Sequence, residues 1–273
     1  MIRRFALAGL AFLLLAPTPA PAAPEPGSER MAPHRAAYRL MLDRSRDSGA
    51  ILQAQGLMLF EVVDACDAWA VRQRFTLIVE DRDGNSIETS SDYSTLEAKD
   101  GTRLRFSLTQ ITEGAVTSRV AGTAELTPQG GTVRYTEPAS VEEPLPAGTL
   151  LPMLHTIRSL AAARAGQRIL VAPLFDGTSE DGAQDTTTII SGGWLAPQPN
   201  ATFPALATQG SARMRIAFFD RDAASQGGGA ATPSYEVSLR YYENGVADEL
   251  KMDFGEFTVD GRLAELQPIP SPC

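Results

Sequence analysis

The amino-acid sequence predicts a mainly β fold, in which one large, curved antiparallel sheet packs on a single amphipathic helix. Apolar residues alternate with polar ones at a period of two over most of the chain, and turn-forming residues recur every 10 to 16 residues. Only one stretch, around residues 149–165, has apolar residues at helical spacing. A lone amphipathic helix in such a protein has to bury its apolar face against the sheet.

The N-terminus has the pattern of a cleaved secretory signal. Arg3 and Arg4 precede an apolar run from Phe5 to Ala16, and small residues and prolines follow it. The run is too short to span a bilayer as a stable anchor, and the small residues predict cleavage after Ala22. We therefore expect an exported protein with a signal peptide over residues 1–22 and a flexible lead-in over residues 23–32.

The charge of the chain limits its partners. With 24 Lys and Arg against 33 Asp and Glu, the formal charge is −9 at pH 7. Loss of residues 1–22 removes two arginines and no acid, which leaves −9 − 2 = −11. We expect no nucleic-acid binding through bulk charge. No later stretch approaches about 18 consecutive apolar residues, so we also expect no stable membrane insertion of the mature chain.

Six strands are expected before the helix, joined as a meander. The breaks between them carry turn residues, as at Asp83-Gly84-Asn85, Asp100-Gly101, Glu113-Gly114 and Gly130-Gly131. The alternating patterns predict strands over His34–Leu42, Ala50–Val63, Trp69–Glu80, Ser86–Glu97, Thr102–Ile111 and Ala115–Leu126.

The expected helix has signals at both ends. Thr149 is the predicted N-cap, Pro152 is tolerated in the first turn, and Gly166 is a natural C-terminal stop. The polar face would carry His155, Thr156 and Ser159. The apolar face would carry Leu150, Met153, Leu154, Ile157, Leu160 and Ala161.

Strands resume after the helix, separated by polar, Pro-rich or Gly-rich loops over residues 176–185, 195–211 and 221–233. No linker separates two cores, so we expect a single domain over residues 33–273. The strands expected in this half are Arg168–Phe175, Thr186–Ser191, Arg213–Phe219, Tyr235–Tyr242, Val246–Phe254 and Arg262–Leu266.

The chain contains two cysteines, Cys66 and the C-terminal Cys273. In an oxidising compartment an even pair indicates a disulfide, and two cysteines permit one intramolecular pairing. Such a bond would also prevent the C-terminus from fraying. Two free thiols or an intermolecular bridge are the alternatives. A CxxC redox centre is excluded, because no second cysteine lies near either residue.

The motif search gives no catalytic, metal or cofactor site. His34 and His155 are far apart and have no HxxxH or HExxH pattern, so both are interpreted as structural. There is no GxSxG, and the glycines at Gly192-Gly193 and Gly227-Gly228-Gly229 lack the helix and lysine of a phosphate loop. We interpret them as loop glycines and expect no cofactor.

One acidic stretch gives a weak indication of a calcium site. The run from Asp176 to Asp185 could supply oxygen ligands to calcium, but its spacing is not that of an EF-hand. Asp81 and Asp83 are interpreted as part of a hairpin turn. A carboxylate pair for glycoside hydrolysis is a spatial feature, and no particular pair stands out in the sequence.

Several short strings resemble one known family when they are taken together. The chain resembles the EipB family of periplasmic cell-envelope integrity proteins over almost the whole mature chain, most strongly at the CxxW motif and the terminal cysteine. The matching strings are His34-Arg-Ala-Ala-Tyr38-Arg-Leu40; Cys66-Asp67-Ala68-Trp69; Tyr93, Glu97, Asp100, Gly101 and Phe106; Leu145-Pro146-Ala-Gly148-Thr149, Pro152 and His155; Leu174-Phe175-Asp176-Gly177; and Tyr241, Asn244-Gly245-Val246, Asp253-Phe254, Phe257 and Cys273.

The resemblance implies a spiral-like, broken β-barrel that cups one helix, at about residues 149–165. It also implies a structural disulfide between Cys66 and Cys273, a periplasmic location, and a role in keeping the envelope intact under stress. The family is distantly similar to lipoprotein carriers and has no assigned catalytic activity.

Three functions follow as hypotheses. The first is a non-enzymatic periplasmic protein that maintains the envelope by binding an envelope component or a partner protein. The second is a carrier or sensor of a lipid or lipopeptide held in the concave face of the sheet, and the third is a hydrolase of envelope polymers. A carrier needs an open, apolar cavity, whereas a scaffold predicts a concave face that is either filled or polar. The hydrolase would require His34 or His155 to meet carboxylates or a serine in a cleft.

Overall fold

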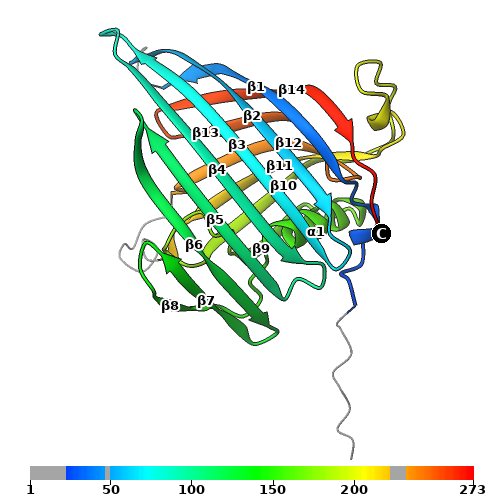
Figure 1. Cartoon of the computed structure of the whole chain (residues 1–273). Helices are drawn as coiled ribbons and strands as arrows, with labels where there is room; N and C mark the ends of the chain where they lie inside the picture. Colours follow the sequence, from blue (N-terminus) through cyan, green and yellow to red (C-terminus); the bar gives the residue numbers. More distant parts are fainter. Residues whose placement is uncertain (1–22, 47–49, 222–231) are drawn as a thin grey trace, which may run out of the picture.

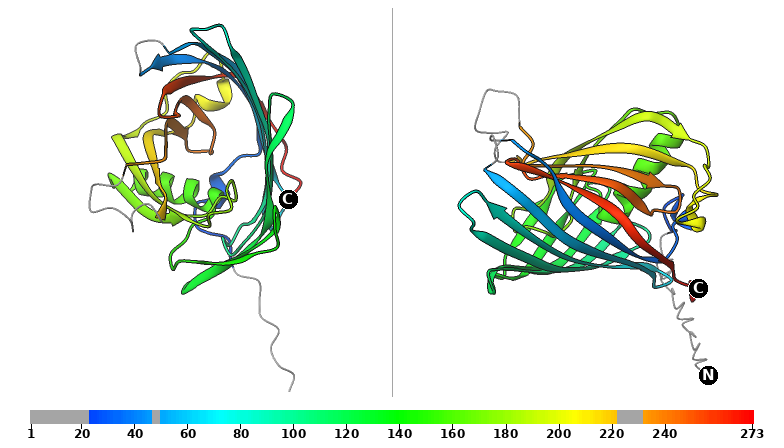
Figure 2. Two further views of the ribbon diagram at one scale, coloured as in Figure 1. Left: turned by 90° about the vertical axis from the view of Figure 1, so that its left-hand side faces the viewer. Right: turned by 90° about the horizontal axis from the view of Figure 1, so that it is seen from above.

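The computed structural model describes residues 23–46, 50–221 and 232–273. Within them, fourteen strands form one antiparallel sheet that curls around one α-helix (Figure 1; Figure 2). The elements are η1 (Ser28–Arg30), β1 (His34–Ser45), β2 (Ile51–Asp64), β3 (Ala68–Asp81), β4 (Ser86–Ala98), β5 (Arg103–Thr112), β6 (Ala115–Thr127), β7 (Gly130–Glu137), β8 (Glu142–Leu145), α1 (Pro152–Arg164), β9 (Ile169–Leu174), β10 (Gln184–Leu195), η2 (Pro204–Leu206), β11 (Ser211–Phe219), β12 (Tyr235–Tyr242), β13 (Ala247–Asp253) and β14 (Phe257–Pro268). The expected signal peptide and the Gly227–Gly229 run lie outside the described residues.

The sheet is a barrel that is broken at one place. Its strand order is β8-β7-β6-β5-β4-β3-β2-β1-β14-β13-β12-β11-β10-β9, so the first and last strands pair at its centre. The two edges, β8 and β9, follow one another in sequence and are joined by the segment that contains α1. Leu150, just before α1, forms an isolated parallel bridge with Leu174 of β9. The predicted spiral-like, broken antiparallel barrel around one helix is confirmed.

All twelve expected strands are present, and β7 and β8 are additional. Gly130-Gly131 was expected as a turn, but Thr127 pairs with Gly130, so the turn lies just before the glycines and β7 begins with them. Gly192-Gly193, expected as loop glycines, form a bulge inside β10 with φ of +71° and +75°. β14 starts at Phe257 rather than Arg262, and a Cβ at Gly261 would lie 3.2 Å from side-chain carbons of both Leu250 and Leu40.

The helix begins later than its sequence signals suggest. Leu151 is the N-cap residue and makes no side-chain cap, so the prediction of Thr149 as N-cap is wrong. The Thr149 hydroxyl instead donates to the carbonyl of Pro146 and closes the turn before the helix. The predicted stop is confirmed, because Gly166 has φ of +74° and its N–H donates to the carbonyl of Ala163.

The predicted division of the helix into two faces is partly wrong. His155 and Ser159, expected on an exposed polar face, are buried, and Ala161, expected on the inner face, is exposed. The reason is that α1 lies inside the curved sheet and contacts β9, β10 and β11, so more than one side of it is covered (Figure 2). Only a narrow strip that includes Arg158 and Arg164 faces solvent.

Residues 23–32, expected as a flexible lead-in, instead pack against one end of the sheet. The backbone N–H of Glu25 donates to Lys99, and that of Ala32 donates to Asn244. Met31 is buried in the main apolar cluster. This segment therefore joins strands from both halves of the chain before β1 begins.

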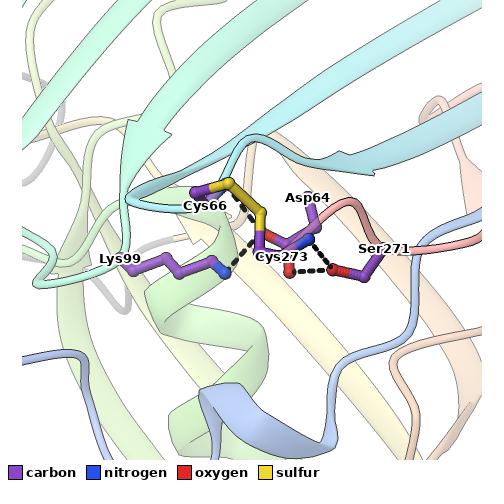
Figure 3. Close-up of a disulfide and its surroundings, with 5 residues drawn as sticks. All are labelled: Asp64, Cys66, Lys99, Ser271 and Cys273. Carbon is purple, nitrogen blue, oxygen red and sulfur yellow. Dashed lines mark hydrogen bonds and ion pairs between the residues drawn. A yellow bond between two sulfur atoms is a disulfide. The ribbon is translucent and has the colours of Figure 1, made fainter.

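A disulfide between Cys66 and Cys273 ties the C-terminus to the turn between β2 and β3 (Figure 3). The two Cα atoms are 5.4 Å apart, within the usual range for a disulfide. In the sheet, β1 lies between β14 and β2, so the tail after β14 crosses the end of β1 to reach Cys66. The structure thus has the intramolecular pairing, rather than free thiols or an intermolecular bridge.

The Asp64 carboxylate supports this connection. It accepts hydrogen bonds from the Lys99 ammonium, the Ser271 hydroxyl and the backbone N–H of Cys66 (Figure 3). Burial raises the pKa of Asp64, but these hydrogen bonds outweigh it and hold the pKa below its usual value. The carboxylate therefore stays charged and connects the crossing tail, through Ser271, to Lys99 and to the turn that carries Cys66.

We expect Cys273→Ser to lower the free energy of unfolding, by at most about 5 kcal/mol, because a loop closed across 207 residues no longer restricts the unfolded chain. Denaturant unfolding measures this loss, and wild-type protein should change its gel mobility on reduction. Ser271→Ala keeps the disulfide and serves as a control, with an expected loss of about 1 kcal/mol. Equal stability of oxidised protein and Cys273→Ser would contradict the prediction.

Candidate functional site

The concave side of the sheet holds a cavity of about 740 Å³. Its walls come from β1 to β5 on one side and from β12 and β13 on the other, and its floor includes residues of α1. This volume lies within the range of about 300–1,000 Å³ that is usual for small-molecule sites. The helix therefore does not fill the cup completely.

A separate apolar cluster fills the neighbouring part of the cup. Phe106 packs edge-to-face on Tyr135 and on Phe175, with ring centroids 5.8 and 5.3 Å apart. These rings, with residues of β6, β7 and the segment before α1, form a closed core beneath β5 to β8. The sheet thus encloses a packed half and an open half.

The walls of the cavity are mostly apolar. Alternation along the strands turns Tyr38, Met58 and Phe75 inward as one row of neighbours across β1, β2 and β3. Residues of β12 and β13 complete the apolar wall at Val237, Leu239, Leu250 and Met252. Such a surface favours an occupant that is itself largely apolar.

Aromatic side chains form the rim of the cavity. The ring of Phe254 lies 5.7 Å from that of Tyr235 and 5.3 Å from that of Phe257, measured between centroids. Phe254 and the nearby wall residue Ile87 are 39% and 51% exposed. Because these apolar groups face solvent, we take this end of the cavity as its entrance.

The opposite end is closed by α1 and by the segment before β1. Met153 and Thr156 of α1 line it together with Met31 and Tyr241. The Thr156 hydroxyl donates to the carbonyl of Pro152, and its oxygen lies 3.5 Å from the Tyr241 hydroxyl. Burial raises the pKa of Tyr241, so this phenol remains neutral.

One wall carries a stripe of uncharged polar groups: Gln73, Thr89, Ser91 and Gln110, on β3, β4 and β5. Ser91 and Gln110 are directly paired across β4 and β5. Among the described residues that line the cavity there is no Lys or Arg, and the single carboxylate, Glu256, belongs to the entrance side. The cavity can therefore offer hydrogen bonds to a ligand without offering a counter-ion.

The two histidines occupy different places. His34 lines the cavity near its closed end, and its Nδ1 lies 2.8 Å from the carbonyl oxygen of Ala32. His155 is on the buried side of α1, with Nε2 3.0 Å from the hydroxyl of Thr188 on β10. Burial lowers the pKa of His34, and it lowers that of His155 to about 4, so both rings are neutral at pH 7. The structure does not bring the two histidines together.

The acidic run from Asp176 to Asp185 begins with a tight turn. The Asp176 carboxylate accepts hydrogen bonds from the backbone N–H and the hydroxyl of Thr178, and its carbonyl accepts one from the Tyr93 hydroxyl. Burial raises the pKa of Asp176. Among the described residues, no group of three or more His, Cys, Asp or Glu side chains could hold a metal ion.

Asp81 closes the β3–β4 hairpin, as expected. Its carboxylate accepts hydrogen bonds from the backbone N–H groups of Asp83 and Asn85 and from the Asn85 side chain.

Glu97 holds the first turn of α1 in place at the closed end of the cavity. Its side chain is only 1% exposed and reaches from β4 to the start of α1. There it accepts hydrogen bonds from the backbone N–H groups of Met153 and Leu154, each at 2.8 Å. These N–H groups have no partner within the helix, and Leu151 supplies no side-chain cap. Burial raises the pKa of Glu97 to about 7, although the two amide hydrogen bonds act to lower it.

Sequence patterns do not identify these site residues. Glu97 matched the family strings, but nothing near it in the sequence indicates that it caps a helix more than 50 residues away. Gln73 and Gln110 occupy ordinary inward-facing strand positions, and only the curvature of the sheet brings their strands around one cavity.

Comparison with known proteins gives one consistent result. The EipB-like family model matches residues 26–270. The chain is 29% identical over 240 residues to the cell envelope integrity protein EipB of Brucella abortus (strain 2308), covering 87% of this chain and 84% of that protein. The chain is also similar to a protein from Brucella abortus whose crystal structure is known. That protein is described as β-barrel-like and is assigned to a domain of unknown function. That match has a TM-score of 0.78 and 27% identity, over 88% of this chain and 99% of the other.

The described part of the chain has no helix that is both long enough and apolar enough to cross a membrane.

We expect Glu97 to contribute to stability in a pH-dependent way. Because its pKa is raised from 4.5 to about 7 by folding, the folded state binds the proton more tightly than the unfolded state between these values. Its contribution is fully present below pH 4.5 and is lost as the pH rises through about 7. The unfolding free energy of wild-type protein relative to Glu97→Gln should fall over this range, by about 3 kcal/mol.

Unfolding in urea at a series of pH values measures this difference. The lowered pKa of His155 acts in the opposite direction, since its stabilising effect is lost as the pH falls through about 4, but it is common to both proteins and cancels. His155→Gln is the matched control and should keep the dependence on Glu97. A constant difference between pH 4.5 and 7 would contradict the assignment.

Proposed function

The chain belongs to the EipB-like family, and on that premise we propose that it is a non-enzymatic periplasmic protein that maintains the cell envelope by binding a lipid-like ligand in its cavity. The similarity to the cell envelope integrity protein EipB of Brucella abortus supports the role in envelope integrity. The secretory pattern of residues 1–22 supports export. The ligand is an apolar component of the envelope, carried or sensed in the concave face of the sheet.

The observation that carries this proposal is the open, apolar cavity. A protein that served only as a scaffold would need no interior space of about 740 Å³, and apolar side chains lining an unfilled space lose the contacts that a packed core gives them. An acyl chain would restore those contacts. The aromatic entrance between Tyr235 and Phe257 gives such a chain an apolar route from solvent.

The surroundings of the histidines support a binding role over hydrolysis. His34 contacts a backbone carbonyl and His155 contacts a threonine hydroxyl. Neither contact is the pairing with a carboxylate that would orient a general base. Binding, rather than covalent chemistry, is therefore the proposed activity.

We expect protein purified from the periplasm to carry lipid. Native mass spectrometry should show a bound mass in addition to the chain, and solvent extraction should release a species with an acyl chain. Ligand-free protein together with a co-purifying protein partner would favour the scaffold function and contradict this proposal.

We expect Val237→Trp to abolish lipid binding and function together, because the indole would project from β12 into the cavity. Ser238→Trp is the matched control, since its side chain leaves the same strand on the opposite face. Cells lacking the protein are expected to be sensitive to detergent. Ser238→Trp should restore their growth and Val237→Trp should not, with both proteins present at equal levels. Full rescue by Val237→Trp would contradict a role for the cavity.

A further inference from the structure

Two hydroxyl groups that line the cavity already have hydrogen-bond partners within the protein. The Tyr38 hydroxyl donates to the carbonyl of Ala247, and the Thr156 hydroxyl donates to the carbonyl of Pro152. Each of these protons is committed to a backbone oxygen. The closed end, where Thr156 lies, therefore offers a ligand mainly apolar surface.

Three polar side chains of one wall have no such partner: Gln73, Ser91 and Gln110, on β3, β4 and β5. In the described part of the chain no hydrogen bond joins these side chains to another residue, since the contact of Gln110 with Thr117 uses its backbone carbonyl. Gln73 lies two residues from Phe75, and Ser91 pairs with both Phe75 and Gln110, so all three side chains turn inward. All three are half-buried, which leaves surface that a ligand can reach.

The charges around this wall decide the charge of the ligand group. A buried anion needs a cationic partner, and the described lining residues include no Lys or Arg. A buried cation needs a carboxylate, but Glu256 belongs to the entrance side. The nearest acid on the same strand as Ser91, Glu97, already accepts two backbone N–H groups from α1. The three side chains therefore suit a neutral group that both donates and accepts hydrogen bonds.

The spacing of the three side chains decides which neutral group they fit. Ser91 and Gln110 are directly opposed, whereas Gln73 pairs with Tyr93, two residues further along β4. The two carboxamides thus start two strand spacings, about 10 Å, apart across the sheet and point to its concave side. A single hydroxyl is too small to meet both. A trans secondary amide directs its N–H and its C=O to opposite sides, and a carboxamide can accept from the one or donate to the other.

We propose that the cavity binds a neutral lipid in which a secondary amide joins two apolar arms, and that Gln73 and Gln110 hold this amide between the closed end and the entrance. One arm lies toward Met153 of α1, and the other lies toward Phe254 at the entrance. The apolar residues of β12 and β13 cover the opposite side of the ligand. This inference rests on the proposed lipid-binding function and specifies the ligand class of the same cavity.

Two isomeric amides test the position of the polar group: N-heptyloctanamide, with the amide at the centre of the chain, and N-tridecylacetamide, with the amide near one end. They contain the same atoms and the same polar group, so a difference in affinity reports where the cavity holds the amide. Each is titrated into delipidated protein from the periplasm that holds a fluorescent apolar dye. Wild-type protein should bind the central amide about 25-fold more tightly, the effect of two net hydrogen bonds.

Gln73→Met and Gln110→Met are the decisive variants, because methionine is an unbranched apolar side chain that fills the same space without a carboxamide. Each should reduce the preference for the central amide about fivefold, and the double variant should bind the two isomers equally. Its affinity for N-tridecylacetamide should not fall, which shows that the cavity is intact. Gln55→Met is the matched control, since Gln55 is exposed on β2 and does not line the cavity. It should keep the wild-type preference.

Heptyl octanoate tests the need for a donor, because an ester oxygen replaces the N–H at the same place in the chain. The affinity for N-heptyloctanamide relative to this ester should be about fivefold lower in the double variant than in wild-type protein. Equal affinity of wild-type protein for the two isomers, or an unchanged preference in the double variant, would overturn the amide assignment and leave lipid binding in place. Failure of every probe to displace the dye would overturn both proposals.

Discussion

The hydrogen bonds from the first turn of α1 to Glu97 hold the helix inside the sheet, and the shape of the cavity depends on them. The carboxylate lies on β4, the fifth strand in the spatial order, and accepts hydrogen bonds from two backbone N–H groups of a helix that has no side-chain cap of its own. This arrangement places Met153 and Thr156 at the closed end. Burying an acid without a cation is costly, and the raised pKa of Glu97 reflects that cost. The structure tolerates it because helix N-terminal amides favour negative charge.

The strands that pair to complete the sheet are the first and last strands of the chain, and not the two edge strands of the sheet. β1 and β14 meet at the centre, and the disulfide holds the tail beyond β14 on the neighbouring turn. The open edges, β8 and β9, lie where the chain leaves the sheet to form α1. Helix and packed aromatic cluster together fill the side near this break. The space that remains is bounded by the strands around the central β1–β14 pair and by β12 and β13 on the opposite wall, and this is the cavity.

The chemistry of the cavity follows from which residue types face inward. Apolar side chains, an aromatic entrance and a stripe of amides and hydroxyls are present, whereas lysine and arginine are absent from the described lining. The arginines instead form pairs with acids on the outer surface, as Arg72 does with Asp92 and Arg213 with Glu249. The described lining of the cavity is thus apolar or weakly polar and has no cationic side chain, which suits the lipid-like ligand proposed for it.

The sequence by itself determined the class of fold, twelve of the strands and the stop of the helix at Gly166, and it limited the cysteines to one intramolecular pairing. Each depends on local periodicity, on turn residues or on the presence of two cysteines in the chain. The family strings also pointed to the barrel around one helix. Only the tertiary structure decided that the helix starts after Leu151, that His155 and Ser159 are buried, and that Glu97 caps α1 from another strand. It alone showed a cavity beside His34. These features arise where strands far apart in sequence curve toward one another, and a residue's inward or outward position does not tell what it will meet across the interior.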